Sequence, residues 1–390
     1  MVILMHKQQP LGADASTELC FLSATELAAA YRAKTLSPVD VTRAILQRIE
    51  RFNPIINAFV TVTADHAIAA AKESERRFAT GEIRGPLEGI PVSIKDLSPT
   101  QGVRTTFGSR VYADHVPDED APIVERLKRS GSVLLGKTNT PEFGWKSPTD
   151  NPLFGPTRNP WKLDRTAAGS SGGTAAAVAS GMGPIGTGGD GGGSIRQPAS
   201  FCGIFGLKPT FGLVPMYPPS VVGTFVSEGP LSRTVRDAAM MLNVIAGPDY
   251  RDIFSAPGPP TDYLAACDGS IRGLRVAWSP TLGYAAVDPV VRAVTERAAR
   301  RFTELGCTVE EADPGWPDPC ELFHVLFLWP RRWRGQPPSS QSGRGSLIPD
   351  LSRSSNEDAS SVRSMSRGRK YSATSYSSRR LVSFRPMISC

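Results

Sequence analysis

The sequence lacks the residue clusters that build metal sites and disulfide frameworks. Its six cysteines show no C-x-x-C spacing, and its four histidines stand far apart along 390 residues. The spacing therefore predicts neither a zinc site nor a set of disulfides, and it is typical of a protein from the reducing cytoplasm. No apolar run approaches the length of about 18 residues that a membrane-spanning helix needs, so we expect no membrane partner.

An excess of either charge is also missing from most of the chain. The whole sequence carries 44 Lys and Arg against 37 Asp and Glu, a net charge of +7. Residues 331–390 hold 12 basic and 3 acidic residues, so the first 330 residues hold 32 against 34, a net charge of −2. We expect no nucleic-acid partner, because the basic charge is confined to the last 60 residues.

Regular patterning ends near Pro330. The last 60 residues contain 17 serines, and 11 of their 12 basic residues are arginine. Helical or strand periodicity does not extend there beyond a few residues. We expect residues 331–390 to be either a disordered, Arg/Ser-rich tail or the product of a shifted reading frame in a GC-rich gene.

The rest of the chain alternates between helical and strand patterns. A capping box at Ser23–Glu26 and the pair Ser37-Pro38 begin two helices, and further helices are expected near 65–80, 121–129, 235–246 and 289–305. One more helix is expected to begin around Ser171 or Gly172. Short apolar strands are expected near 89–95, 132–135, 274–278 and 307–310. This alternation predicts an α/β layered fold with a mixed sheet covered by helices on both faces. We divide the chain into an N-terminal helical segment (1–85), an α/β core (86–325) and the tail.

Three glycine motifs match known patterns without their structural context. Residues 131–138 fit the phosphate-binding pattern G-x-x-x-x-G-K-[ST], but their variable positions, Ser-Val-Leu-Leu, indicate a strand rather than a loop. Residues 186–191 fit G-x-G-x-x-G, yet no strand clearly precedes them. Residues 169–173 fit G-x-S-x-G, a pattern in which the serine, here Ser171, is a nucleophile. That function needs a histidine base later in the chain, and His324 is the only histidine in a suitable position. We assign none of these functions.

A lysine and two glycine runs with serines remain. Lys95 ends an apolar strand, Ser170 and Ser171 lie between glycines, and Ser194 ends a second glycine run. Singly, each feature is ordinary, since serines beside glycines are usually turns or helix caps. Together they supply what acyl transfer without histidine requires. These parts are a hydroxyl nucleophile, a lysine base kept neutral because burial lowers its pKa, and backbone N–H groups that converge on an oxyanion.

These residues lie within a long stretch that resembles the amidase signature family. The stretch includes NPLFGPTRNPW (151–161), AAGSSGGTAAAVASG (167–181) and GDGGGSIRQPASFCGIFGLKPTFGLVP (189–215). The resemblance reaches back to Lys95 and fades near residue 325, where family members usually continue with further patterned sequence. Two positions depart from the family pattern: Gly189, where threonine is more common, and Ala168, where glycine is.

The resemblance implies an amidase that hydrolyses a small-molecule carboxamide through a seryl acyl-enzyme, with no cofactor and no metal. It implies that Ser194 is the nucleophile, Ser170 the bridging serine after a cis peptide bond, and Lys95 the base. It also implies an oxyanion hole built from the N–H groups of Gly191, Gly192, Gly193 and Ser194.

Two other interpretations stay open. The string from Ser194 to Pro198 suits the A subunit of a glutamyl-tRNA(Gln) amidotransferase, a glutaminase that uses the same triad to release ammonia. The altered C-terminal sequence also fits an inactive, truncated or frame-shifted amidase that acts at most as a binding scaffold. Neither the particular amide nor the oligomeric state follows from the sequence.

Overall fold

The computed structural model describes residues 15–220, 222–256, 261–323 and 325. The chain separates into two compact units, of which the first extends through Tyr263 and the second begins at Leu264. The predicted tail at 331–390 lies outside the described residues, as does His324. The segment 1–85, predicted to be helical, also contributes a strand to the main sheet.

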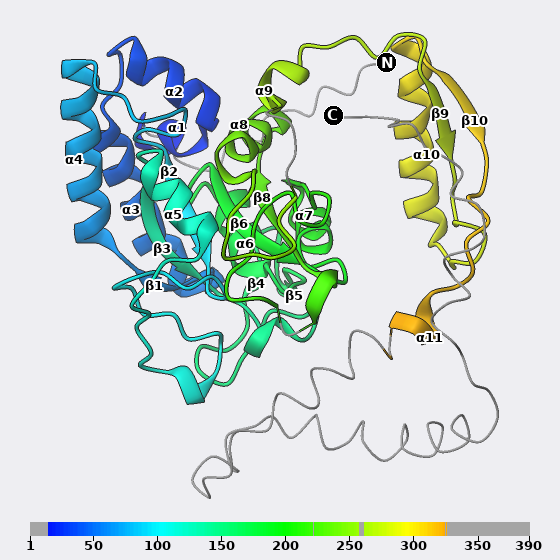
Figure 1. The fold of residues 1–390 in the computed structure, drawn as a ribbon, viewed down its shortest axis with the longest axis horizontal. Coiled ribbons are helices and arrows are strands. Elements are labelled where there is room, and N and C mark those ends of the chain that lie inside the picture. Colours follow the sequence, from blue (N-terminus) through cyan, green and yellow to red (C-terminus); the bar gives the residue numbers. More distant parts are fainter. Residues whose placement is uncertain (1–14, 221, 257–260, 324, 326–390) are drawn as a thin grey trace, which may run out of the picture. The chain divides into compact units, whose positions relative to one another are not determined.

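The first unit is an α/β fold in which helices flank a six-stranded sheet on both faces (Figure 1). The strands of this sheet are β1 (Phe59–Val62), β2 (Pro91–Lys95), β3 (Val133–Thr138), β6 (Ile185–Asp190), β7 (Phe205–Gly206) and β8 (Ser227–Ser232). The helices are α1 (Ala15–Phe21), α2 (Ala24–Arg32), α3 (Pro38–Ile56), α4 (Ala64–Thr80), α5 (Pro122–Arg129), α6 (Gly172–Ala179), α7 (Arg196–Cys202) and α8 (Val235–Ile245). Shorter elements are a hairpin of β4 (Arg158–Asn159) and β5 (Lys162–Thr166), and the 3₁₀ helices η1 (Arg110–Tyr112), η2 (Glu142–Gly144) and η3 (Gly223–Phe225).

The sheet is mixed, as predicted, with the strand order β1-β3-β2-β6-β8-β7. Strand β2 runs parallel to both β3 and β6, whereas β1 is antiparallel to β3 and β8 is antiparallel to β6 and β7. Every residue of β2 and of β8 is buried. Because β2 is a central strand with partners on both sides, its last residue, Lys95, lies inside the fold.

The helix ends follow the capping signals of the sequence. The Ser23 hydroxyl accepts the N–H of Glu26, whose carboxylate accepts the N–H of Ser23, and this is the predicted capping box of α2. Ser37 caps α3, and Gly81, with a φ of 80°, ends α4. Local hydrogen bonding and glycine's tolerance of positive φ therefore account for these boundaries.

Strand β6 differs from the predicted secondary structure. Its sequence, IGTGGD, contains three glycines, which disfavour a strand on propensity alone. Packing overrides that preference, because a Cβ on Gly186 would lie 2.2 Å from Ser93 Oγ and a Cβ on Gly188 would lie 2.5 Å from Leu231 Cδ1. The G-x-G-x-x-G match therefore lies within this strand and the turn after it.

Two neighbouring glycines of β6 are expected to respond oppositely to alanine. A Cβ on Gly189 meets Val226 at 3.7 Å, an ordinary contact, whereas a Cβ on Gly188 overlaps its neighbours. We expect Gly189→Ala to raise the free energy of unfolding by about 0.4–1 kcal/mol, because alanine restricts the unfolded chain. Gly188→Ala is expected to lower it by about 1–3 kcal/mol through overpacking. Urea unfolding measures both changes, and shifts of the same sign would contradict this packing of β6.

The second unit contains β9 (Arg275–Trp278), α10 (Pro289–Glu304), β10 (Thr308–Glu311) and α11 (Cys320–Phe323), and α9 (Tyr263–Ala266) spans the boundary. Strands β9 and β10 pair in parallel, and α10 connects them. This strand–helix–strand order agrees with the predicted one. None of the described helices has the length and apolar character to cross a membrane.

Candidate active site

Lys95 is a buried lysine with 2% of its surface exposed. Its Nζ donates hydrogen bonds to Ser170 Oγ at 2.7 Å and to Ser171 Oγ at 2.8 Å. A longer contact of 3.4 Å joins Nζ to the carbonyl oxygen of Gly189. The lysine and the serine pair that the sequence analysis singled out therefore meet inside the protein.

Backbone geometry positions the serine pair. The peptide bond between Gly169 and Ser170 is cis, as the family resemblance implies. A Cβ on Gly169 would lie 2.3 Å from the carbonyl oxygen of Ser147, so only glycine lets these two segments approach so closely. Ser171 follows directly and precedes the first residue of α6.

Ser194 lies next to this pair, in the turn that follows β6. The N–H of Ser171 donates to the carbonyl oxygen of Ser194 at 3.1 Å, and Ser194 is partly buried. Three chain segments thus bring the Lys95 amine, the two serine hydroxyls bonded to it and Ser194 into one region. Such a set contains the groups that a serine nucleophile needs for activation by a lysine base.

Asp190 holds the glycine turn through several hydrogen bonds. Its carboxylate accepts the backbone N–H groups of Gly193 at 2.7 Å and Ile195 at 3.1 Å, and it forms a 2.9 Å salt bridge with Arg196. Burial by itself would raise the pKa of Asp190, but Arg196 and the N–H groups outweigh it and lower the pKa to about 2. The carboxylate is therefore ionised at neutral pH, when it accepts these bonds best.

Gly193 is one of the glycines that the resemblance implies as oxyanion donors. Its N–H already donates to Asp190, so it is engaged in holding the turn. Its φ of 114° is one that residues with a side chain rarely adopt, and a Cβ there would lie 2.8 Å from Gln197 Nε2. Gly191, Gly192 and Ser194 are the other oxyanion donors that the resemblance implies.

Sequence reasoning missed the parts played by Asp190, Arg196 and Ser171. Asp190 and Arg196 flank the glycine run, and opposite charges around a turn are a weak signal for an ion pair. Ser171 was considered only as a nucleophile with a histidine base. In the structure its hydroxyl is fully buried and bonded to Lys95 instead.

Two further buried charges adjoin this centre, on β3 and β8. Lys137 Nζ donates to the carbonyl oxygen of Ser98 and to two threonine hydroxyls, and burial lowers its pKa to about 8. Glu228 Oε1 accepts the Ser98 hydroxyl at 2.8 Å, and burial raises the pKa of Glu228 to about 7. The N–H of Ser98 donates to the carbonyl oxygen of Lys95 at 3.0 Å, so Ser98 links both groups to the backbone of Lys95.

Glu228 is expected to make stability depend on pH. Because its folded pKa is raised from 4.5 to about 7, the native state binds the proton more tightly, and stability falls as pH rises across this window. Glu228→Gln keeps an acceptor for Ser98 and removes the buried charge. We expect the variant to match the wild type at pH 5 and to exceed its unfolding free energy at pH 8 by about 1–3 kcal/mol. Urea unfolding at both pH values measures the two unfolding free energies. A difference between variant and wild type that is the same at pH 5 and pH 8 would contradict the titration of Glu228 in this window.

The phosphate-binding match does not have the context that it requires. Residues 131–138 run into strand β3, as predicted, and Lys137 is fully buried, which excludes a phosphate-binding loop. The histidine that Ser171 would need, His324, is outside the described residues. Within the part of the chain that the structure describes, no group of three His, Cys, Asp or Glu side chains could hold a metal ion.

Sequence comparisons relate the chain to amide-bond enzymes. The family model described as Amidase matches residues 40–333. The chain is 47% identical over 318 residues to an acylamidase of Rhodococcus erythropolis, and the match covers 81% of this chain and 65% of that protein. It is 45% identical over 295 residues to the A subunit of the glutamyl-tRNA(Gln) amidotransferase of Carboxydothermus hydrogenoformans, covering 75% and 61%. The chain thus spans 61–65% of the length of these two relatives.

Solved structures give the same relationship. A bacterial aryl acylamidase of the amidase signature enzymes family superposes with a TM-score of 0.78 at 35% identity, covering 85% of this chain and 71% of that one. The native peptide amidase from Stenotrophomonas maltophilia superposes with a TM-score of 0.68 at 33% identity, covering 75% and 62%.

Proposed function

Because this chain belongs to the amidase family, we propose that it hydrolyses the C–N bond of a small carboxamide through a seryl acyl-enzyme. The observation that carries the proposal is the pair of hydrogen bonds from Lys95 Nζ to Ser170 and Ser171, beside Ser194. A buried lysine bonded to serine hydroxyls is an arrangement that activates a nucleophile without histidine.

Acylation begins when Ser194 Oγ attacks the carbonyl carbon of the amide. The Ser194 proton passes to Ser170 Oγ, and the Ser170 proton passes to the neutral amine of Lys95. The carbonyl oxygen becomes an oxyanion that accepts the N–H groups of Gly191 and Gly192. Gly193 acts indirectly, because its bond to Asp190 fixes the turn that carries these donors.

The intermediate collapses when the C–N bond breaks. The proton returns from Lys95 through Ser170 to the leaving nitrogen, which departs as an amine or ammonia and leaves an ester on Ser194. Water then attacks this ester and gives its proton to the same relay. The ester C–O bond breaks, Ser194 regains its proton, and a carboxylic acid is released.

The substrate class is tested by hydrolysis of a panel of amides. Two of the similar proteins are named acylamidases, which favours N-acylated amines, including anilides. We expect the purified chain to release the amine from such amides at a rate above the uncatalysed reaction. The scattered cysteines, which show no C-x-x-C spacing, favour a reducing cytoplasm as the place of action.

Similarity to the A subunits of amidotransferases favours a second candidate function. Several of the similar curated proteins are A subunits of glutamyl-tRNA(Gln) amidotransferases. This function predicts glutamine hydrolysis, and ammonia transfer to glutamyl-tRNA when a B subunit is present. Amide hydrolysis without any transfer would favour the stand-alone amidase.

An inactive product is the third interpretation, because residues 331–390 lack the helical and strand patterning of the rest of the sequence. A melting curve followed by circular dichroism separates it from the other two. A cooperative transition supports a folded enzyme, whereas its absence supports an unstable remnant.

A further inference from the structure

Glu228 is a buried acid that the proposed reaction does not yet use. It lies on β8 with 8% of its surface exposed, and its Oε2 is buried without a hydrogen-bond partner among the described residues. Burial raises the pKa of Glu228 to about 7, so the carboxylate is ionised inside the protein at pH 8. A buried charge with one oxygen unsatisfied lowers stability, and its neighbours indicate what else it does.

Two connections fix the position of Glu228 relative to Lys95. The antiparallel pairing of β6 and β8 places Glu228 opposite Gly189, whose carbonyl oxygen lies 3.4 Å from Lys95 Nζ. The Ser98 hydroxyl donates to Glu228 Oε1 at 2.8 Å, and the Ser98 N–H donates to the carbonyl oxygen of Lys95 at 3.0 Å. The carboxylate is thus held both through the neighbouring strand and through the turn after β2.

The charge of Lys95 acts directly on Glu228. Burial raises the pKa of Glu228, and three neighbours lower it, in decreasing order the Ser98 hydroxyl, the Lys95 charge and the Lys137 charge. Lys95 is therefore the principal cation acting on this carboxylate. An interaction between two titratable groups acts equally on both, so an ionised Glu228 favours the ammonium form of Lys95 to the same extent.

Other charges around the centre have partners of their own. Asp96 accepts the hydroxyl and N–H of Thr106, and it is the acid that acts most strongly on Lys137. Asp190 is paired with Arg196 at 2.9 Å. Further charged groups on neighbouring elements are Arg104, Glu142, Lys146, Asp150 and Lys208. Asp96 and Asp190 thus engage other cations, whereas the principal cation for Glu228 is Lys95.

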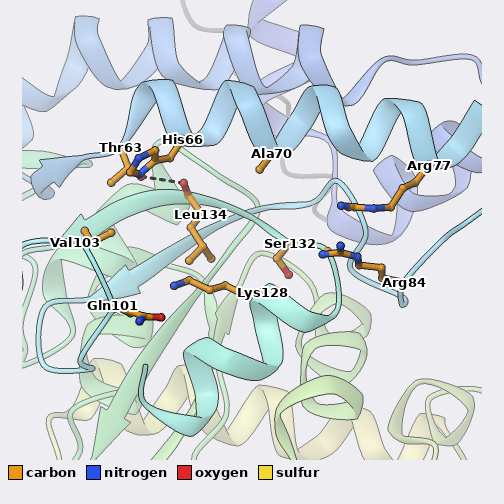
Figure 2. A pocket seen from close by; sticks show the side chains of 11 residues that line it. Thr63, His66, Ala70, Arg77, Arg84, Gln101, Val103, Lys128, Ser132 and Leu134 are labelled. Atoms are coloured by element: carbon orange, nitrogen blue, oxygen red, sulfur yellow. Dashed lines mark hydrogen bonds between the residues drawn. The ribbon is translucent and has the colours of Figure 1, made fainter. Parts of the chain in front are cut away.

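Glu228 is separate from the cavity shown in Figure 2. That cavity lies between α4, α5, the start of β3 and the loop at 101–103. Its cations Arg77 and Lys128 are paired with Glu88 and Asp120. Neither Glu228 nor any predicted catalytic residue lines it, so the Glu228 carboxylate does not act on a molecule in that cavity.

The proposed reaction turns Lys95 into an ammonium each time it takes the proton of Ser170. Little water reaches a buried amine, so a fixed carboxylate nearby lowers the free energy of the charged form. We propose that Glu228 is a positioning residue of this relay, and that its carboxylate, held by Ser98, stabilises the Lys95 ammonium during acylation and deacylation. The carboxylate neither gives nor takes a proton in these steps. The inference rests on the proposed amidase activity.

The dependence of kcat/KM on pH tests this role in Glu228→Gln, which keeps an acceptor for Ser98 and removes the charge. We expect the plateau at high pH to fall about tenfold and the acid limb to move about one pH unit lower, because Lys95 then loses its proton more easily. The variant and the wild type are expected to converge below pH 6, where Glu228 is itself neutral. Glu228→Gln is also expected to be the more stable protein at pH 8, so unfolding would not explain the loss.

Titration of Lys95 by NMR gives a second readout that needs no turnover. Lysine labelled with ¹³C at Cε is incorporated into the full chain, and the Lys95 signal is identified by its absence from Lys95→Met. We expect the pKa of Lys95 to be about one unit lower in Glu228→Gln than in the wild type. A wild type that hydrolyses no amide would overturn the proposed function, whereas the titration still shows whether Glu228 acts on Lys95.

Glu88→Gln is the matched control, because Glu88 is also a buried carboxylate but is bonded to Ser74 and Arg77. It is expected to change kcat/KM less than threefold without moving the acid limb. Ser98→Ala removes the hydroxyl that favours the ionised carboxylate, so kcat/KM at pH 8 is expected to fall about threefold. An unchanged Lys95 pKa and pH profile in Glu228→Gln would overturn the proposal. A tenfold loss of kcat/KM at every pH would also overturn it, because a purely structural role would then explain the data.

Discussion

Replacing Ser194 with alanine is expected to lower kcat/KM for amide hydrolysis by about 10⁴- to 10⁶-fold. The proposed acyl-enzyme forms on Ser194 Oγ, and no step that precedes C–N cleavage proceeds without that oxygen. Neighbouring serines do not replace it, because the Ser170 and Ser171 hydroxyls are committed to Lys95. Initial rates of amine release from an anilide measure the change.

Ser200→Ala is the matched control for this variant. Ser200 is an exposed serine on α7, six residues along the chain, and its replacement is expected to change kcat/KM less than twofold. The Ser194→Ala protein should keep the wild-type melting temperature to within a few degrees. Retention of more than about one per cent of the activity in Ser194→Ala would contradict its role as nucleophile.

Replacing Lys95 with methionine is expected to lower kcat by about 10²- to 10⁴-fold. Methionine has nearly the same length and is apolar, so it fills the buried position while removing the amine that accepts the proton. The Ser170 and Ser171 hydroxyls then lose their shared donor at 2.7 and 2.8 Å. KM is expected to change far less than kcat, because Lys95 acts on protons rather than on substrate binding.

Lys208→Met controls for the loss of a partly buried lysine. Lys208 Nζ bonds to the carbonyl oxygen of Pro209 and not to the serine pair, so a reduction of kcat below threefold is expected. Steady-state kinetics of both variants give kcat and KM separately. If Lys95→Met and Lys208→Met lost activity equally, a general effect of lysine removal would explain the data better than a base at position 95.

Elements governed by local signals were predictable from the sequence. The Ser23 capping box and the Gly81 terminus act within a few residues, so α2 and α4 were expected close to where they lie. Strands β6 and β8 were not expected, because their glycine-rich and polar sequences oppose strand propensity. Their pairing with each other supplies the stability, and this is a contact between residues about forty positions apart.

The residues of the candidate site could be predicted from the sequence, but their arrangement in space could not. Lys95, Ser170 and Ser194 stood out because the glycines around the serines and the family resemblance marked them. That Lys95 bonds two serines, and that Asp190 engages Gly193, depend on side-chain directions that no local pattern encodes. Ala168, which departs from the family's glycine, adopts a left-handed φ of 57°, so that departure carries a backbone cost of about 1–2 kcal/mol.

Covalent labelling of Ser194 tests most directly whether this chain forms a working catalytic centre. The purified protein is incubated with a fluorophosphonate, and the adduct is located by mass spectrometry beside the Ser194→Ala and Lys95→Met variants. We predict one adduct, on Ser194, that is absent from Ser194→Ala and forms at least about 100-fold more slowly in Lys95→Met. A folded protein that takes up no label, or takes it up on another serine, would contradict a nucleophile at Ser194 activated by Lys95.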